Sequence, residues 1–374
     1  MNVQRIPIAR PSFLGNEKKY VLDALESGWI SSIGPYIDRF EKEFASYHGV
    51  RNAIATHNGT IALHLALASA GIGQGDEVIV PDLTFIATSN VVKYCNARPL
   101  LVDVDPGNWN ISLQSIVEAI SPSTKAIIPV HLYGNPARMD EIMKIAREHK
   151  LLVIEDCAEA MGARLGGKKT GTFGHVSCFS FFGNKIMTTG EGGMCLTNDD
   201  ELASKMRILR DHGMNLKKKY WYDQIGFNYR MTNMQAAIGL AQLEQLDSLL
   251  ASRDAIRSRY KEKLASCESI VFQETGGNRH VNWLTTVRLK GLDFESRDAV
   301  MNELSLKGID SRPVFYPIHF MPFYKDPVYS PGANKNSIAV AREGISLPTY
   351  VGLETENIDY IAACLIQTYE KYSV

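Results

Sequence analysis

Lys185 stands between an apolar run and a glycine-rich turn, in the stretch SFFGNKIMTTGEGGM that spans residues 180–194. The run from Val176 to Phe182 has the composition of a buried strand. A lysine directly after such a strand lies where open α/β sheets bind their ligands, outside the carboxyl ends of the strands. With an ordinary pKa of about 10.4, its amine is a poor nucleophile near neutrality unless the site activates it.

Two carboxylates, Glu155 and Asp156, end another predicted buried strand in the stretch VIEDCAEA. Acids at such a position are costly unless they are solvated or paired with a cation. This pattern is compatible with one functional acid and a second acid that caps a helix.

The stretch THNGTIALHLALA, residues 56–68, predicts a site for an anion. Asn58 and Gly59 form a tight turn after a strand, and Thr60 opens an amphipathic helix whose first N–H groups are free. These groups and the helix dipole favour phosphate, although a simple helix cap has the same pattern. GIGQG at residues 71–75 instead ends a helix and precedes a strand, so it predicts a turn and not a dinucleotide-binding loop.

Phe85, in the stretch PDLTFIATSN, is either a core aromatic or a flat platform beside a heteroaromatic ring. A phosphate-type helix start, an acid, an aromatic and a lysine at the strand ends of one sheet are the parts that hold pyridoxal 5'-phosphate (PLP). The lysine would form a Schiff base with the aldehyde of PLP, and the acid would keep the ring nitrogen protonated so that the ring withdraws electrons.

The elements that must position these residues alternate between strand and helix from about residue 50 to 200, which predicts an α/β fold with a mostly parallel sheet covered on both faces. Seven strands are expected, at residues 52–56, 77–80, 99–104, 126–130, 151–155, 176–182 and 193–196. Helical patterns cover residues 60–70, 112–120 and 139–149, and a near-helical apolar period predicts one long helix over 234–265. We therefore expect a large domain at residues 1–240 and a smaller α+β domain, including the long helix, at 241–374.

The bulk composition excludes several classes of function. Forty basic and 41 acidic side chains give a net charge of −1, so nothing global attracts nucleic acid or an anionic membrane. The one compact basic run, Lys217 to Lys219 beside Tyr220 and Trp221, is more typical of a solvated loop than of a nucleic-acid site. Six cysteines without C-x-x-C spacing, and the lack of a signal-peptide-like or membrane-spanning apolar run, predict a cytoplasmic protein with neither a membrane nor a metal partner.

Three stretches resemble the DegT/DnrJ/EryC1/StrS family of nucleotide-sugar aminotransferases: EDCAEAMGA, GTFGHVSCFSFFGNKIMTTGEGGM and GFNYRMTNMQAAIGLAQLEQL, which begin at residues 155, 171 and 226. The resemblance covers nearly the whole chain and implies fold type I of the PLP-dependent transferases, the fold of aspartate aminotransferase. It also implies amino transfer from L-glutamate to a nucleotide-linked keto sugar. For the most similar members this is GDP-4-keto-6-deoxy-D-mannose, aminated for lipopolysaccharide O-antigen synthesis. A UDP- or dTDP-linked sugar, aminated at C3 or C4, and a non-catalytic sugar-nucleotide-binding protein are the alternatives.

The resemblance assigns roles around the cofactor. Lys185 would carry PLP covalently and act as acid and base in the 1,3-proton transfer. Asp156 would pair with the pyridine nitrogen, Glu159 would lie near the ring oxygen, and Phe85 would stack on the ring. Some members replace this lysine by histidine and deoxygenate sugars, so the lysine here favours transamination.

The resemblance also assigns a phosphate set and a sugar-nucleotide set. The phosphate would be held by Gly59, Thr60, Ser180 and Asn228, the last contributed by a neighbouring subunit. A site completed in this way implies a homodimer or a higher homo-oligomer. Candidates for the sugar nucleotide are Trp29, Arg230, Tyr316, His319 and the loop Lys217 to Trp221. His57 and Ile186 depart from the serine and threonine that relatives commonly have, which bears on substrate preference more than on reaction type.

Overall fold

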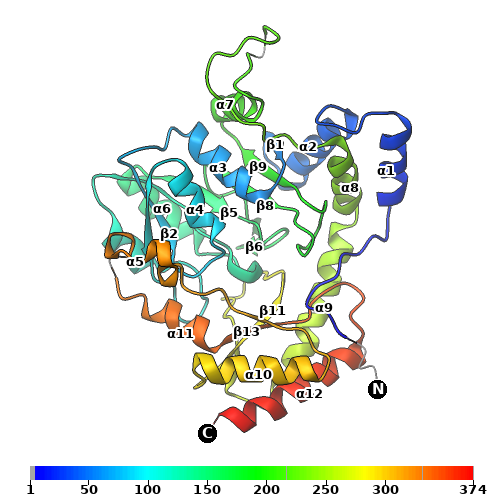
Figure 1. Ribbon diagram of the computed structural model, residues 1–374, viewed down its shortest axis with the longest axis vertical. Helices are drawn as coiled ribbons and strands as arrows, with labels where there is room; N and C mark the ends of the chain where they lie inside the picture. The colour runs from blue at the N-terminus through cyan, green and yellow to red at the C-terminus, as the bar shows by residue number, and fades with distance from the viewer. Residues whose placement is uncertain (1–4, 216, 331, 374) are drawn as a thin grey trace.

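The computed structural model describes residues 5–215, 217–330 and 332–373. Within these residues, a seven-stranded sheet has the strand order β1-β9-β8-β5-β4-β2-β3 (Figure 1). Neighbouring strands from β8 to β3 are parallel, whereas β9 pairs antiparallel with both β8 and β1. The bounds are Asn52–Thr56 (β1), Glu77–Pro81 (β2), Arg98–Val102 (β3), Thr124–Ile127 (β4), Leu152–Asp156 (β5), Val176–Ser180 (β8) and Gly193–Thr197 (β9).

All seven expected strands are present, with ends that differ by up to three residues from the sequence prediction. The apolar run that was expected to reach residue 182 leaves the strand after Ser180. Phe181 still packs in the core, whereas Phe182 is exposed, so hydrophobicity continues past the end of the ladder. The expected large, mostly parallel sheet is therefore confirmed.

Helices cover both faces of this sheet, as a parallel sheet requires. On one face of the sheet, α3, α4 and α7 form a hydrophobic core with the side chains of β2, β5, β8 and β9 on that face. On the other face, α2 and α8 pack over β1, β8 and β9, and α5 and α6 pack over β2 to β5. The bounds are Pro35–His48 (α2), Gly59–Ser69 (α3), Ala87–Tyr94 (α4), Leu113–Ala119 (α5), Met139–His149 (α6), Asp200–Arg210 (α7) and Asn233–Glu244 (α8).

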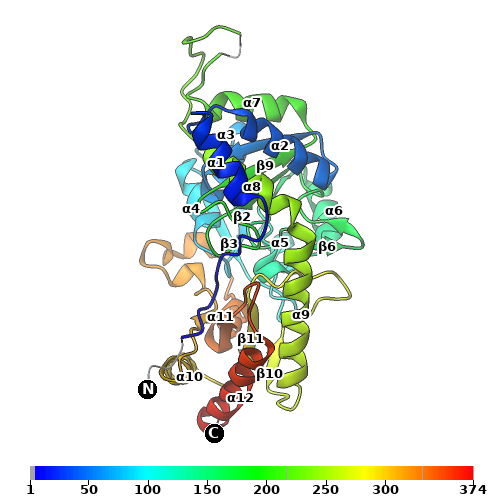
Figure 2. The ribbon, with the colours of Figure 1, turned by 90° about the vertical axis from the view of Figure 1, so that its right-hand side faces the viewer.

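The prediction of one long helix over residues 234–265 is wrong, because the chain forms two helices there. After α8, Gln245 has φ −110° and ψ 6°, and α9 then runs over Leu246–Leu264 (Figure 2). α8 packs against α1 (Glu17–Glu26) and α2, whereas α9 packs against α12 (Thr355–Tyr372). The apolar stripe changes partner at this point, so the helix axis changes as well.

A smaller antiparallel sheet, β10-β11-β13-β12, has its own core with α9, α10 and α12. The expected α+β unit is thereby confirmed, while the domain boundary after residue 240 falls inside α8 and stays a prediction. The outer ends of the two expected domains, residues 1–4 and 374, lie outside the described residues. The bounds are Ile270–Phe272 (β10), Thr285–Leu289 (β11), Phe294–Leu306 (α10), Arg312–Pro313 (β12), Lys335–Glu343 (α11) and Gly344–Leu347 (β13).

None of the described helices combines the length and the apolar character that crossing a membrane requires. The N-terminal segment runs along the molecule from α1 to the smaller sheet, where Ile6 forms a bridge with Ile309 (Figure 2). Residues near the start of the chain thus pack against the smaller unit.

Candidate active site

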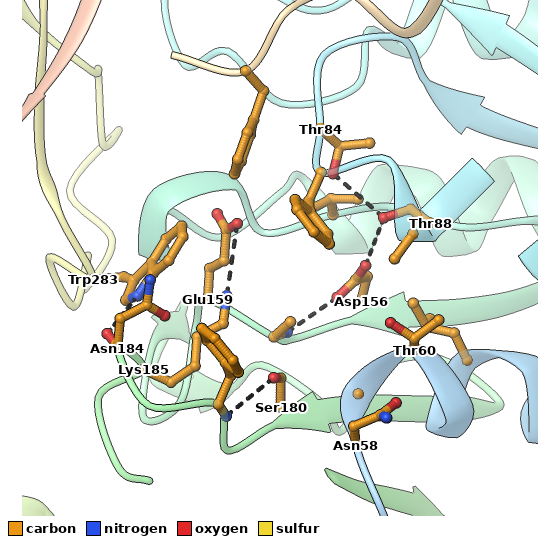
Figure 3. Close-up of a pocket in the computed structure, with 18 of the residues that line it drawn as sticks. Asn58, Thr60, Thr84, Thr88, Asp156, Glu159, Ser180, Asn184, Lys185 and Trp283 are labelled. Atoms are coloured by element: carbon orange, nitrogen blue, oxygen red, sulfur yellow. Dashed lines mark hydrogen bonds and ion pairs between the residues drawn. The ribbon is translucent and has the colours of Figure 1, made fainter. Parts of the chain in front are cut away.

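A cavity of about 360 Å³ opens at the carboxyl ends of β5 and β8, beside the start of α3 (Figure 3). Seven residues that the sequence assigned to the cofactor line it: Gly59, Thr60, Phe85, Asp156, Glu159, Ser180 and Lys185. Lys185 and Glu159 lie toward one side of the view in Figure 3, Asn58 and Thr60 lie toward the other, and Asp156 lies between them.

The start of α3 forms one wall of the cavity. Asn58 is the N-cap, and its side chain accepts a hydrogen bond from the backbone N–H of Ile61 at 2.9 Å. Gly59 and Thr60 line the cavity at this helix end, where N–H groups have no partner inside the helix. A Cβ on Gly59 would lie 2.7 Å from the Cβ of Ser180, so the glycine allows the helix to approach the end of β8. This cradle suits an anionic group.

Asp156 ends β5 and is only 5% exposed. Its carboxylate accepts hydrogen bonds from the Thr88 hydroxyl at 2.8 Å and from the Ala158 N–H at 3.1 Å. Burial raises the pKa of Asp156, while the Ala158 and Thr88 hydrogen bonds and the charge of Lys185 counteract that effect. A cation bound beside this carboxylate would stabilise its charge further.

Glu155, the other acid of this strand end, does not cap a helix. Its two oxygens accept hydrogen bonds from the backbone N–H groups of Gly171, Phe173 and Gly174, and from His131 Nε2 at 3.1 Å. Burial alone would raise the pKa of Glu155, but the hydrogen bonds from His131 and these amides outweigh burial and lower it. Glu155 therefore fixes the turn that precedes β8, and the helix-cap alternative is wrong.

Lys185 and Glu159 form a loose ion pair, with 4.0 Å between Lys185 Nζ and Glu159 Oε1. The other oxygen of Glu159 accepts a hydrogen bond of 2.6 Å from the backbone N–H of Tyr133. Burial raises the pKa of Glu159 to about 7 against the charge of Lys185, and burial lowers the pKa of Lys185. The site thus holds an acid that can exchange protons near neutrality and, beside it, an amine whose pKa is lowered by burial.

The sequence reasoning missed several residues that line the cavity, among them Trp283, Phe315 and Thr88. Trp283 and Phe315 come from the smaller unit and line the cavity, and Thr88 holds Asp156. Thr88 lies in the first turn of α4, and no pattern in the sequence assigned it a role. Nothing local in the sequence signals that Trp283 would lie beside Lys185.

The remaining candidates do not line this cavity. Asn228 is exposed, and its side-chain oxygen accepts hydrogen bonds from Arg230, which also pairs with Asp211 at 2.8 Å. Tyr316 accepts a hydrogen bond from Arg297, and His319 pairs with Asp82 at 2.5 Å. Trp29 is half exposed, and Lys217 to Trp221 belong to a loop that projects beyond α7 (Figure 1). Their roles in binding stay predictions.

His57 and Ile186, the two departures from the family pattern, differ in burial. His57 is exposed, and its backbone N–H donates to the carbonyl of Tyr229 at 2.9 Å. Ile186 is 5% exposed and belongs to the hydrophobic core beneath the cavity.

The cavity fits PLP by the chemistry of its walls. The helix start with Ser180 suits a phosphate, and the buried carboxylate of Asp156 suits a protonated ring nitrogen. Lys185 is the amine that can condense with an aldehyde, and Phe85, 54% exposed, offers a flat face to a ring.

Comparisons with known proteins agree with this chemistry. The sequence pattern described as the DegT/DnrJ/EryC1/StrS aminotransferase family matches residues 12–366. A GDP-perosamine synthase of Caulobacter vibrioides is 52% identical over 371 residues, covering 98% of this chain and 99% of that protein. A GDP-perosamine synthase of Escherichia coli O157:H7 is 45% identical, covering 97% of this chain and 98% of that protein.

Among solved structures, Spr1654 of Streptococcus pneumoniae has been determined in a PMP form and a PLP form. The PMP form has a TM-score of 0.94 at 28% identity and covers 98% of each chain. The PLP form has a TM-score of 0.93 at 27% identity and covers 98% of this chain and 99% of that one.

Proposed function

The chain belongs to the DegT/DnrJ/EryC1/StrS aminotransferase family, and we propose that it moves the amino group of L-glutamate to C4 of GDP-4-keto-6-deoxy-D-mannose, producing GDP-perosamine. As a member of this family it is a PLP-dependent sugar aminotransferase with the fold expected from the sequence. The observation that carries the choice of substrate is the 52% and 45% identity, over nearly full length, to two GDP-perosamine synthases.

Bound PLP supplies an aldehyde that takes up an amino group and a ring that withdraws electrons. In our proposal, Lys185 is the residue that would hold this aldehyde covalently in the resting enzyme. Its amine, when free, would act as the acid and base that moves a proton during amino transfer. The lowered pKa of Lys185 supports this role, because a catalytic base works best when its pKa is near the working pH.

The other residues of the cavity hold the cofactor in this proposal. Asp156 keeps the ring nitrogen protonated through an ion pair, and Glu159 lies by the ring oxygen. Gly59, Thr60 and Ser180 bind the phosphate, and Phe85 stacks on the ring. Trp283 and Phe315 cover the cavity from the smaller unit, which limits access of water.

We further propose that Asn228 of a second copy completes the phosphate site, so that the working enzyme is at least a homodimer in the cytoplasm. Support comes from the exposed arm that carries Asn228. This arm includes Trp221, Tyr222 and Ile225, of which Ile225 is 91% exposed. Large apolar side chains gathered on a projecting segment are typical of a surface that a partner covers.

The substrate is tested by incubating purified enzyme with PLP, L-glutamate and one keto-sugar nucleotide at a time. We expect 2-oxoglutarate and a 4-amino sugar nucleotide with the GDP-linked sugar, and turnover at least 100-fold slower with UDP- or dTDP-linked 4-keto sugars. The two products are measured by coupled assay and mass spectrometry. Faster turnover of a UDP- or dTDP-linked sugar would replace the proposed substrate.

The role of Lys185 is tested without turnover. Borohydride reduction of the PLP-loaded protein, followed by peptide mapping, should place one pyridoxyl group on Lys185. Lys185→Ala should bind PLP without forming the reducible bond and should lose turnover. A label on another lysine would reject the assignment.

A further inference from the structure

Trp283 contacts both the amine of Lys185 and the backbone that carries it. Lys185 Nζ lies 3.7 Å from the centre of the Trp283 ring, and the indole N–H donates a 2.9 Å hydrogen bond to the carbonyl of Asn184 (Figure 3). Trp283 lies just before β11, in the smaller unit, and is 4% exposed. One side chain thus reaches across from the smaller unit to both ends of the lysine.

The indole is itself held on several sides. Its ring stacks on Tyr133 with centroids 5.8 Å apart and an interplanar angle of 14°, and its backbone N–H donates to the Tyr133 carbonyl at 3.3 Å. Its backbone carbonyl accepts a 2.7 Å hydrogen bond from Arg253, which is buried on α9. Tyr133 has φ 55°, a conformation that costs energy for a residue with a side chain. Because these contacts hold Trp283 rigidly, its side chain can fix the position of Lys185.

A lysine released from the cofactor has a flexible side chain with four rotatable bonds, and its amine must stay within reach of the reacting carbon. An aromatic face near a desolvated ammonium attracts it, and more strongly than at an exposed site. The indole N–H also fixes the peptide between Asn184 and Lys185. A small displacement of a catalytic group slows a reaction strongly, so both contacts bear on rate.

We propose that Trp283 is a positioning residue for Lys185: its ring face holds the freed amine over the cavity while its N–H tethers the backbone of the lysine. This inference rests on the proposed function, in which Lys185 binds the cofactor. It adds a residue from the smaller unit to the set of residues around the cofactor, which the sequence placed entirely in the larger one.

The charged groups around Lys185 decide how removal of the Trp283 ring changes the pKa of its amine. Glu159 and Asp156 face the amine and favour its charged form. Arg10 and Arg253 share a small cavity with Lys185 on its other side. In Trp283→Leu, leucine keeps this environment apolar but has no ring to attract the ammonium, so the pKa of Lys185 should fall by about one unit. Trp283→Phe keeps a ring face and should leave that pKa nearly unchanged.

The test compares Trp283→Leu, Trp283→Phe and the wild-type protein. In cofactor-free protein, the pH dependence of the rate at which Lys185 condenses with added PLP, with loss of water, reports the pKa of the amine. We expect Trp283→Leu to shift this profile down by about one unit and to lower kcat at least tenfold. KM for L-glutamate should change less than threefold. Trp283→Phe keeps the ring face but loses the N–H tether, so it should restore the profile and give a kcat between those of wild type and Trp283→Leu.

Tyr260→Phe is the matched control for packing. Tyr260 is buried in the core of the smaller unit and donates to the carbonyl of Pro348, away from the cavity. This variant should lower the melting temperature without moving the profile or kcat. If Trp283→Leu behaves in the same way, or if Trp283→Phe is as defective as Trp283→Leu, the inference is overturned. Borohydride labelling of Lys185 in each variant separates this failure from failure of the proposed function, which would leave Lys185 unlabelled even in wild type.

Discussion

The carboxylate of Asp156 is fixed by hydrogen-bond donors that carry no net charge. Thr88 and the Ala158 N–H donate hydrogen bonds to its carboxylate, and the side chain is almost fully buried. An ion pair with the cofactor's ring nitrogen in such a place is worth a few kcal/mol. Asp156→Ala should therefore slow turnover by at least ~100-fold, and the half-reaction with L-glutamate, seen as bleaching of the visible band of bound PLP, should slow in the same way. Thr88→Val keeps the charge and should cost less than tenfold, so near-normal turnover in Asp156→Ala would contradict the proposed ion pair.

Glu159 gives the cofactor-free protein a pH-dependent stability. Burial raises its pKa from 4.5 to about 7, so between these values the folded protein binds more protons than the unfolded chain. The free energy of unfolding should consequently fall as pH rises through this window, by up to about 3 kcal/mol. Glu159→Gln should remove this part of the slope, as measured by urea unfolding between pH 4.5 and 7. Identical slopes in the two proteins would show that Glu159 ionises normally.

At the scale of elements, the close approach of α3 to β8 builds the phosphate end of the cavity. Gly59→Ala would put a methyl group 2.7 Å from the Cβ of Ser180 and 3.2 Å from its Cα, so the first turn of α3 must move away from β8. We expect PLP to bind at least tenfold more weakly, measured by titration of its visible band, with a smaller change in kcat at saturating PLP.

The opposite end of the same helix provides the control for that substitution. Gly71 follows α3 with φ 77°, and a Cβ there would meet no atom within 4 Å. Gly71→Ala should lower stability through its backbone conformation alone and leave the affinity for PLP unchanged. Equal loss of affinity in both variants would mean that the helix as a whole, and not its contact with Ser180, sets the binding.

The elements that the sequence predicts well are those with a local signal. Strand ends and the capped start of α3 follow from short patterns. The sequence alone could therefore place Lys185, Asp156 and Gly59 at one edge of the sheet. Gln245 carries no such signal, since neither glycine nor proline marks the break, and the change of packing partner from α1 and α2 to α12 decides it. The contact of Trp283 with Asn184 joins residues 99 positions apart, and no local period encodes such a contact.

At the scale of the whole molecule, our proposal has one chain supply most of the site and a second copy supply Asn228. Asn228 is exposed and does not line the cavity of its own chain. The segment that carries it is anchored by Tyr229, whose hydroxyl lies 3.0 Å from His64 Nδ1 on α3. Asn228 can therefore be presented outward in a fixed position, as a contribution to a second copy requires.

Subunit mixing tests this arrangement. Lys185→Ala and Asn228→Ala should each be nearly inactive as pure proteins, because every site in each dimer lacks one of the two residues. After the two variants are unfolded together and refolded in equal amounts, half of the dimers are hybrids, and each hybrid has one intact site out of two. We expect about a quarter of wild-type activity to return, at a fixed concentration of total protein. If Asn228 acts within its own chain, one site of each hybrid lacks the lysine and the other lacks the asparagine. Both sites are then defective, and no activity above that of the parent variants returns.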